Sequence, residues 1–150
     1  MSSQLVRRRM EVRDWMRANP VTVEAGALLV KAYKLMEENE VRRLPVVNRQ
    51  REMVGIITRN DILQHVPFFP DEDELEDELP YINLTVEEVM SYDPISIEST
   101  ATIQEAAELM LEAKVSGLPV REGNRLVGIL TESDIFRLVV AEWGEEDGKG

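Results

Sequence analysis

Two short segments of this 150-residue chain could bind a phosphorylated ligand. They read Gly55-Ile-Ile-Thr-Arg-Asn-Asp61 and Gly128-Ile-Leu-Thr-Glu-Ser-Asp134. Thr-x-x-Asp after a strand is typical of a capping box, in which the hydroxyl accepts a bond from a first-turn amide and the carboxylate accepts one in return. Such a helix start also offers free amides to a phosphate, and the aspartate can accept bonds from both hydroxyls of a ribose. A glycine three residues before the threonine would let a ligand or a second backbone approach.

Both segments belong to an internal repeat that covers most of the chain. Residues 12–62 recur as residues 86–135, with an offset of 74 up to Arg51 and 73 after it. The matched positions include Met16/Met90, Pro20/Pro94, Val41/Val115, Leu44-Pro45-Val46/Leu118-Pro119-Val120 and Thr58/Thr131. One copy of such a repeat usually cannot bury its apolar face alone, so we expect the copies to pack on each other and any function to lie where they meet.

Each copy predicts an α/β (α+β) unit with the order β-α-β-β-α. In the first copy we expect a strand at 21–23, an amphipathic helix at 27–39, strands at 41–47 and 53–57, and a helix from 58 onward. Pro45 predicts an edge strand or the start of a strand. The second copy predicts the same elements at 95–97, 101–113, 118–121, 126–130 and 133–140.

The chain divides into five expected segments. They are an N-terminal arm or helix at 1–11, motif 1 at 12–66, an acidic linker at 67–85, motif 2 at 86–140 and a flexible tail at 141–150. The linker holds seven acids within 71–78, which predicts an exposed connector. Phe68, Phe69, Tyr81 and Ile82 are expected to attach its ends to the body, and Arg7-Arg8-Arg9 is expected to be a solvated face.

Composition excludes several classes of site. The chain has no cysteine, so disulfides, thiolate zinc sites and a cysteine nucleophile are excluded. The net charge of −12 opposes binding to nucleic acid or anionic lipid. No segment is apolar enough to span a bilayer, and we expect a cytoplasmic protein. His65 has no metal-ligand spacing, and no serine has a histidine partner, so we predict no metal site, no catalytic residue and no enzyme.

The ordered motifs, present twice, resemble a tandem pair of cystathionine-β-synthase (CBS) domains. The residues that carry this resemblance are Met-x3-Pro followed by a β-branched strand, Leu-Pro-Val, and Gly-[Ile/Val]-[Ile/Leu]-Thr-x-x-Asp, over about residues 12–139. The resemblance implies two pseudo-twofold-related motifs packed as one disc-like module, with two clefts between them. It also implies an adenosyl ligand in those clefts, namely AMP, ADP or ATP, or alternatively S-adenosylmethionine or a dinucleotide. The sequence leaves open whether magnesium accompanies ATP.

The resemblance also implies the site residues. One cleft is assigned Arg42, Arg43, Thr58, Asn60 and Asp61, with Ile95, Val115 and Ser116 near the base. The other is assigned Thr131, Ser133 and Asp134, with Thr22 and Val41 near the base. Arg59 adds a third cation to the first cleft, whereas Ser116, Gly117 and Glu132 supply none to the second, so we expect the Asp61 cleft to hold the more highly charged ligand. The alternative for Arg42 and Arg43 is a pair of surface arginines bonded to acids such as Glu40.

Two functions follow as alternatives. The first is a nucleotide-binding sensor that regulates an unidentified protein, and the second is an interaction module without a ligand. A homodimer is expected in both, because the second helix of each copy has more apolar residues than one face needs. These residues are Ile62, Leu63, Ile135, Phe136, Leu138, Val139 and Val140.

Overall fold

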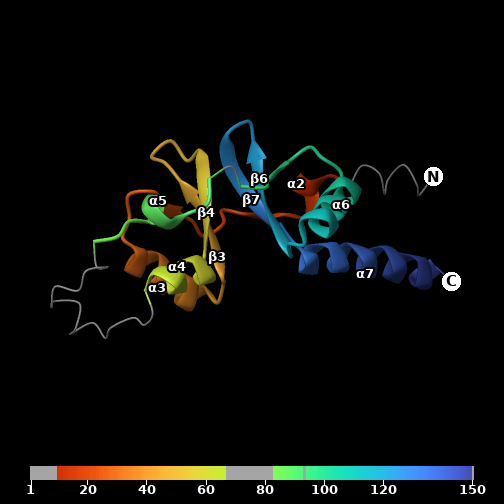
Figure 1. Cartoon of the computed structure of the whole chain (residues 1–150). Coiled ribbons are helices and arrows are strands. Elements are labelled where there is room, and N and C mark those ends of the chain that lie inside the picture. Colours follow the sequence, from red (N-terminus) through yellow and green to blue (C-terminus); the bar gives the residue numbers. More distant parts are fainter. Residues whose placement is uncertain (1–9, 67–82, 93, 150) are drawn as a thin grey trace. The chain divides into compact units, whose positions relative to one another are not determined.

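The computed structural model of the chain describes residues 10–66, 83–92 and 94–149 (Figure 1). Arg7-Arg8-Arg9, the acidic run 71–78 and the aromatic residues expected to anchor it lie outside these residues. The chain forms two compact units: unit 1 consists of residues 1–20 and 95–150, and unit 2 consists of residues 21–94. Both units mix helices with a small sheet, which confirms the predicted α+β class.

Unit 2 contains a three-stranded sheet of order β2-β3-β4. Its elements are β2 (Val23–Glu24), α3 (Leu29–Asn39), β3 (Arg43–Val47), β4 (Met53–Thr58), α4 (Arg59–His65) and α5 (Val86–Val89). Strand β2 runs parallel to β3, and β3 runs antiparallel to β4. The buried face of α3 presents Leu29, Ala32 and Met36, at the spacing that one side of a helix requires, to a core that includes Leu44 and Ile57.

Unit 1 repeats this architecture with one more paired strand, in the order β1-β7-β6-β5. Its elements are α2 (Val12–Trp15), β1 (Arg17–Ala18), β5 (Ile97–Glu98), α6 (Ile103–Ala113), β6 (Gly117–Glu122), β7 (Arg125–Thr131) and α7 (Glu132–Lys149). The buried residues of α6, Ile103, Ala106 and Met110, are the repeat equivalents of those in α3. The same apolar pattern has therefore produced the same core twice.

The units do not coincide with the sequence repeats, because the first helix of each repeat packs with the other repeat. Val12 of α2 is fully buried in the core of unit 1, and its amide donates to the carbonyl of Ala101 at 2.8 Å. Val86 of α5 is likewise fully buried in unit 2, with its amide 2.8 Å from the carbonyl of Ala27. Neither repeat completes its core alone, in agreement with the expectation from the repeat.

Two local features differ from the predictions. Pro45 lies inside β3, the central strand of its sheet, but β3 pairs with β2 only from Val46 onward. The missing amide of Pro45 therefore interrupts no paired stretch between these strands. The tail was expected to fray from residue 141, whereas α7 continues to Lys149. Residues 141–149 contain no proline, and Ala141, three glutamates and Lys149 favour a helix strongly enough to offset the two glycines there.

Candidate functional site

The first Gly-x-x-Thr-x-x-Asp segment forms a capping box at the start of α4. Thr58 Oγ1 accepts a hydrogen bond from the amide of Asp61 at 3.0 Å, and the amide of Thr58 donates to Asp61 Oδ2 at 3.0 Å. The other carboxylate oxygen of Asp61 makes no hydrogen bond to the described residues. The capping prediction is confirmed, and one acceptor oxygen of Asp61 is left for another group.

A pocket of about 460 Å³ lies beside this capping box. Strand register places Arg43 of β3 opposite Thr58 of β4, and the amide of Arg59 donates to the carbonyl of Arg42 at 2.7 Å. Most of the polar residues predicted for the first site are thereby brought to one place, and Asp61 is bonded to one of them, Thr58. The pocket is lined by Arg42, Arg43, Thr58, Arg59, Asn60 and Leu63.

The three arginines of this pocket differ in their surroundings. The guanidinium of Arg59 lies 5.7 Å from the ring centre of Tyr33, 3.5 Å from its hydroxyl and 3.7 Å from a carboxylate oxygen of Glu37. In contrast, neither Arg42 nor Arg43 makes an ion pair with any of the described residues, including Glu40. The surface-pair alternative for these two arginines is therefore not observed. Their charges are available to an anion, whereas that of Arg59 is partly engaged by α3.

The second segment forms the same turn, but its carboxylate has more partners. Asp134 Oδ2 accepts bonds from the amide of Thr131 at 2.8 Å and from its hydroxyl at 3.1 Å. Asp134 Oδ1 forms an ion pair with Arg137 and lies 3.6 Å from Nε of Arg17. The carboxylate is fully buried, so it is held by its own unit on both oxygens.

Two arginines that the sequence does not predict at the second site, Arg17 and Arg137, reach Asp134. No cation was expected there. Arg137 could have been anticipated, because a residue three positions after Asp134 lies on the same side of a helix. Arg17 could not, because β1 reaches β7 only through tertiary pairing of residues more than 100 positions apart in the chain.

The glycine that stands three residues before the threonine in both repeats is explained by a second backbone rather than by a ligand. A Cβ atom at Gly55 would lie 2.7 Å from the carbonyl oxygen of Ser91 and 2.6 Å from the sulfur of Met90. At Gly128 the corresponding contacts are the carbonyl oxygen of Arg17 at 2.9 Å and the sulfur of Met16 at 2.5 Å. The sequence allowed either a ligand or a second backbone to approach each glycine, and in both units a backbone segment does so.

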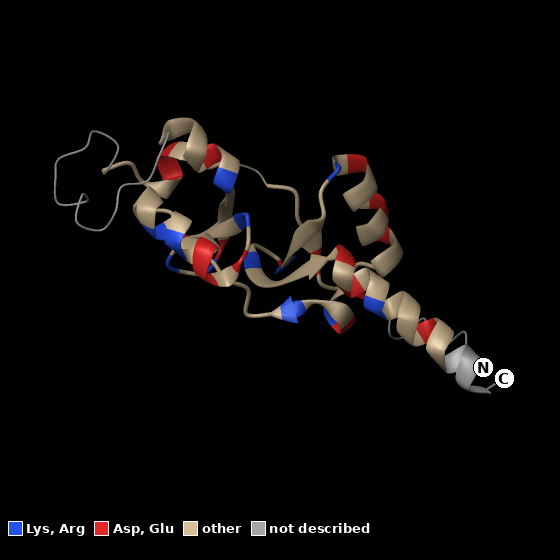
Figure 2. Cartoon of the chain, turned by 90° about the horizontal axis from the view of Figure 1, so that it is seen from below, with Lys and Arg blue, Asp and Glu red and all other residues tan. Residues whose placement is uncertain are grey.

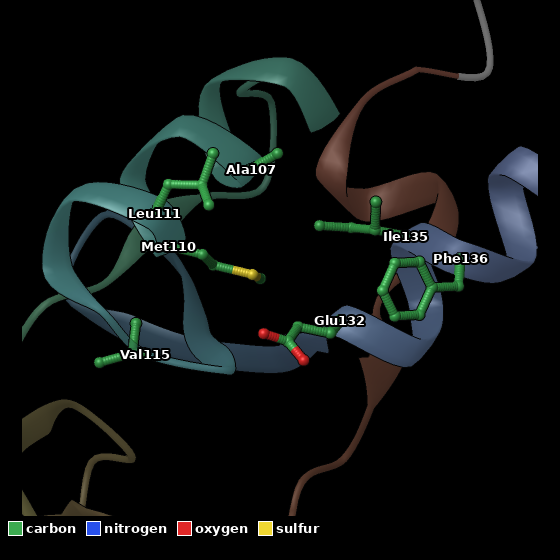
Figure 3. A pocket seen from close by; sticks show the side chains of 7 residues that line it. All are labelled: Ala107, Met110, Leu111, Val115, Glu132, Ile135 and Phe136. Carbon is green, nitrogen blue, oxygen red and sulfur yellow. The ribbon is translucent and has the colours of Figure 1, made fainter.

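Each of the remaining predicted site residues belongs to one of the two units. Thr22 and Val41 are half-buried in unit 2, and in unit 1 Val115 is half-buried while Ile95, Ser116 and Ser133 are exposed. Each predicted cleft combines residues of one unit with residues of the other, and those combinations remain predictions. Val115 lines an apolar pocket of about 240 Å³ in unit 1, together with Ala107, Met110, Leu111, Glu132, Ile135 and Phe136 (Figure 3).

A metal centre would need several His, Asp or Glu side chains close together in the described part of the chain. No group of three or more His, Asp or Glu side chains there could hold a metal ion. His65 is exposed at the end of α4, with Nδ1 2.9 Å from the carbonyl oxygen of Asp61, as expected of a helix-end residue. None of the described helices is both long and apolar enough to cross a membrane.

Comparison with known proteins gives the family. The CBS domain profile matches residues 12–67 and 86–141. A CBS domain-containing protein of Dictyostelium discoideum is 35% identical over 133 residues, which are 86% of this chain and 90% of that protein. An uncharacterized protein of Methanocaldococcus jannaschii is 34% identical over 134 residues, and there the chain spans about half of the relative, 48%.

Solved structures agree with this result. The CBS-pair protein CBSX2 from Arabidopsis thaliana is 26% identical with a TM-score of 0.74, over 88% of this chain and 95% of that chain. The CBS domain pair of protein MJ0100, solved with 5′-methylthioadenosine and S-adenosyl-L-methionine, is 27% identical with a TM-score of 0.69, over 88% of this chain and 97% of that chain. The chain therefore belongs to the CBS domain family and carries two CBS domains in tandem.

Proposed function

We propose that this chain is a regulatory module that binds an adenine nucleotide, AMP, ADP or ATP, and catalyses no reaction itself. The observation that carries the proposal is the pair of arginines, Arg42 and Arg43, with no ion-pair partner among the described residues, beside the Thr58–Asp61 capping box. The arginines would hold phosphate oxygens, and the free oxygen of Asp61 would accept a ribose hydroxyl. The adenosyl ligands of the MJ0100 domain pair support the choice of ligand class, as does a structure of CBSX2 in complex with AMP.

The first test is a ligand panel read by thermal unfolding and calorimetry. It compares AMP, ADP, ATP with and without magnesium, NAD and S-adenosylmethionine. A ligand that binds only the folded chain should stabilise it by about 2.7 kcal/mol at a hundredfold excess over its Kd. If no member of the panel at millimolar concentration changes the melting temperature, the chain is an interaction module without an adenosyl ligand.

A second test locates the phosphate. Arg43→Ala should weaken ATP or ADP binding by roughly tenfold or more, because a charge-assisted bond to phosphate contributes about 1.5–3 kcal/mol when shielded from water. Adenosine, which has no phosphate, should bind Arg43→Ala and the unmodified chain alike. Arg49→Ala is the matched control, since it removes the same charge from an exposed position between β3 and β4. If both variants lost the same nucleotide affinity, only the net charge of the chain would matter and the phosphate would not be located at Arg43.

The two Thr-x-x-Asp segments should contribute unequally. Asp61→Asn should lower nucleotide affinity, because Asp61 keeps one oxygen for the ligand. Asp134→Asn should change affinity less, because both oxygens of Asp134 are already bonded within unit 1. A loss in Asp134→Asn as large as that in Asp61→Asn, in variants shown to be folded, would contradict the assignment.

We also propose that the chain forms a homodimer through the helices of each unit. Of the apolar residues expected at this interface, Leu63, Phe136 and Val140 are exposed, whereas Ile62 and Leu138 are buried in the cores. The exposed three, and not the buried two, support an interface. Light scattering at tens of micromolar should give about twice the chain mass of 17.1 kDa. A mass near that of one chain would exclude the dimer at this concentration.

A further inference from the structure

Arg59 lines the pocket proposed for the nucleotide, but its guanidinium contacts α3. The guanidinium lies 5.7 Å from the ring centre of Tyr33, 3.5 Å from the Tyr33 hydroxyl and 3.7 Å from a carboxylate oxygen of Glu37. A charge-assisted hydrogen bond normally measures about 2.7–2.9 Å, so both polar contacts are long. Nε of Arg59 is buried and makes no hydrogen bond to the described residues. Arg59 is therefore held by α3 with hydrogen-bonding capacity left over.

The ion pair between Arg59 and Glu37 is weak, because water reaches both partners. The side chain of Arg59 is 43% exposed and that of Glu37 is 54% exposed. Exposed pairs of this kind contribute little to stability, whereas a phosphate bonded to a guanidinium inside a pocket forms shorter and stronger bonds. A phosphate in the pocket therefore competes successfully with Glu37 for the guanidinium of Arg59.

The contact with α3 and the cationic pocket occur together in unit 2, and the equivalent positions of unit 1 have neither. All three residues of the contact are replaced there: Ala107 stands in place of Tyr33, Leu111 in place of Glu37 and Glu132 in place of Arg59. Figure 3 shows that these replacements line a pocket, which has no cationic side chain. Figure 2 shows acidic residues at the start of the long helix that ends at the C-terminus, where α4 instead begins with Arg59. The contact thus accompanies the phosphate pocket and is not a general feature of the repeat.

We propose that Arg59 is shared between α3 and the phosphate of the ligand, and that phosphate binding releases Glu37 and Tyr33 from it. This inference rests on the nucleotide site proposed above and adds how that site regulates: the phosphorylation state of the ligand is registered on α3. Glu37 and the ligand compete because both are anions that bind the same guanidinium. By thermodynamic linkage, the pair between Glu37 and Arg59 must weaken phosphate binding by the same factor by which phosphate weakens the pair.

Calorimetry of the full chain with ATP, adenosine and inorganic tripolyphosphate tests this competition. Glu37→Gln should lower the Kd of ATP and of tripolyphosphate by roughly twofold to fivefold, the range for an exposed ion pair, and leave the Kd of adenosine unchanged. Glu38→Gln is the matched control, since it removes the same charge from the next residue of α3, which is also exposed. In an Arg59→Gln chain, the Glu37→Gln change should have no effect. Equal Kd values for Glu37→Gln and Glu38→Gln, or an effect that persists without Arg59, would overturn the proposal.

A second measurement follows the release of Tyr33 directly. The chain contains three tyrosines, so labelling with fluorotyrosine gives few fluorine NMR signals, and Tyr33→Phe identifies the signal of Tyr33. Saturating tripolyphosphate should shift this signal in the unmodified chain, because the guanidinium leaves the ring, and should not shift it in Arg59→Gln. An unchanged signal in the unmodified chain at saturation, or the same shift in Arg59→Gln, would overturn the proposal.

Tripolyphosphate also separates this inference from the nucleotide proposal. It carries phosphate but no adenosine, so the arginines of the pocket can bind it even in a chain that binds no nucleotide. A tripolyphosphate affinity that depends on Glu37, without nucleotide binding, would overturn the proposed function alone. Nucleotide binding that is insensitive to Glu37 would overturn this inference alone, and absence of binding of either compound would overturn both.

Discussion

At the scale of single residues, the two capping aspartates have the same sequence context and different surroundings. Asp134 is fully buried, with four bonding contacts, while Asp61 is half-buried and bonded through one oxygen. The two arginines at Asp134 are more than half exposed, so their ion pairs contribute little, and the bonds from Thr131 to a buried carboxylate are the stronger interaction. Asp134→Asn is therefore expected to lower the free energy of unfolding by about 1–3 kcal/mol.

Urea denaturation compares this loss with that of Asp61→Asn. The Asp61 variant keeps an acceptor for the amide of Thr58 in a partly solvated position, so its loss should be smaller, below about 1 kcal/mol. If both variants lost the same free energy of unfolding, burial of the Asp134 carboxylate would not determine how much it contributes to stability.

At the scale of secondary-structure elements, Gly55 and Gly128 set how closely the neighbouring chain segments approach β4 and β7. Ala at position 55 would place a Cβ atom 2.7 Å from the carbonyl oxygen of Ser91. This oxygen accepts a hydrogen bond from the amide of Ile56 and cannot move without disturbing that bond. Gly55→Ala and Gly128→Ala should each destabilise the fold by about 1–3 kcal/mol, the range for overpacked sites.

Gly26→Ala is the control for this prediction. No atom lies within 4 Å of a Cβ built at Gly26, so the change should alter the free energy of unfolding by less than about 1 kcal/mol. A Gly55→Ala variant as stable as Gly26→Ala would show that the strand and the segment after α5 are less tightly apposed than described.

At the scale of the whole molecule, each repeat supplies one helix to the unit built mainly by the other. Val12 and Val86 are both fully buried, each in the core of the unit that its own repeat does not dominate. Val12→Ala and Val86→Ala should each lower the free energy of unfolding by on the order of 2 kcal/mol, from two lost methyl groups and the cavity that they leave.

Thermal unfolding followed by circular dichroism measures both losses. Val89→Ala provides a comparison, since Val89 lies in α5 beside Val86 but is only partly buried, and its loss should be smaller. A neutral effect of Val12→Ala would mean that residues 10–20 do not complete the core of unit 1.

The sequence determined the fold class, the β-α-β-β-α order within each repeat and the capping box between Thr58 and Asp61. Apolar spacing alone fixed helix Ile103–Ala113, because a helix buries one side at regular intervals. The local pattern Thr58-x-x-Asp61 specified a bonded turn, since the partners are three residues apart. Duplication also predicted that neither repeat would bury its core alone.

Only the tertiary structure decided which residues each motif contacts. Arg17 reaches Asp134 because β1 pairs with β7, a contact between distant residues that no local pattern encodes. From the sequence, either a ligand or a second backbone could have approached Gly55. The structure shows that the segment at Met90 and Ser91 lies against β4 there. Likewise, Ala107 and Tyr33 occupy equivalent positions on similar helices, but only packing shows that one leaves a pocket and that the other supports an arginine. Local chemistry was readable from spacing, whereas burial and charge partners depend on contacts between segments far apart in the chain.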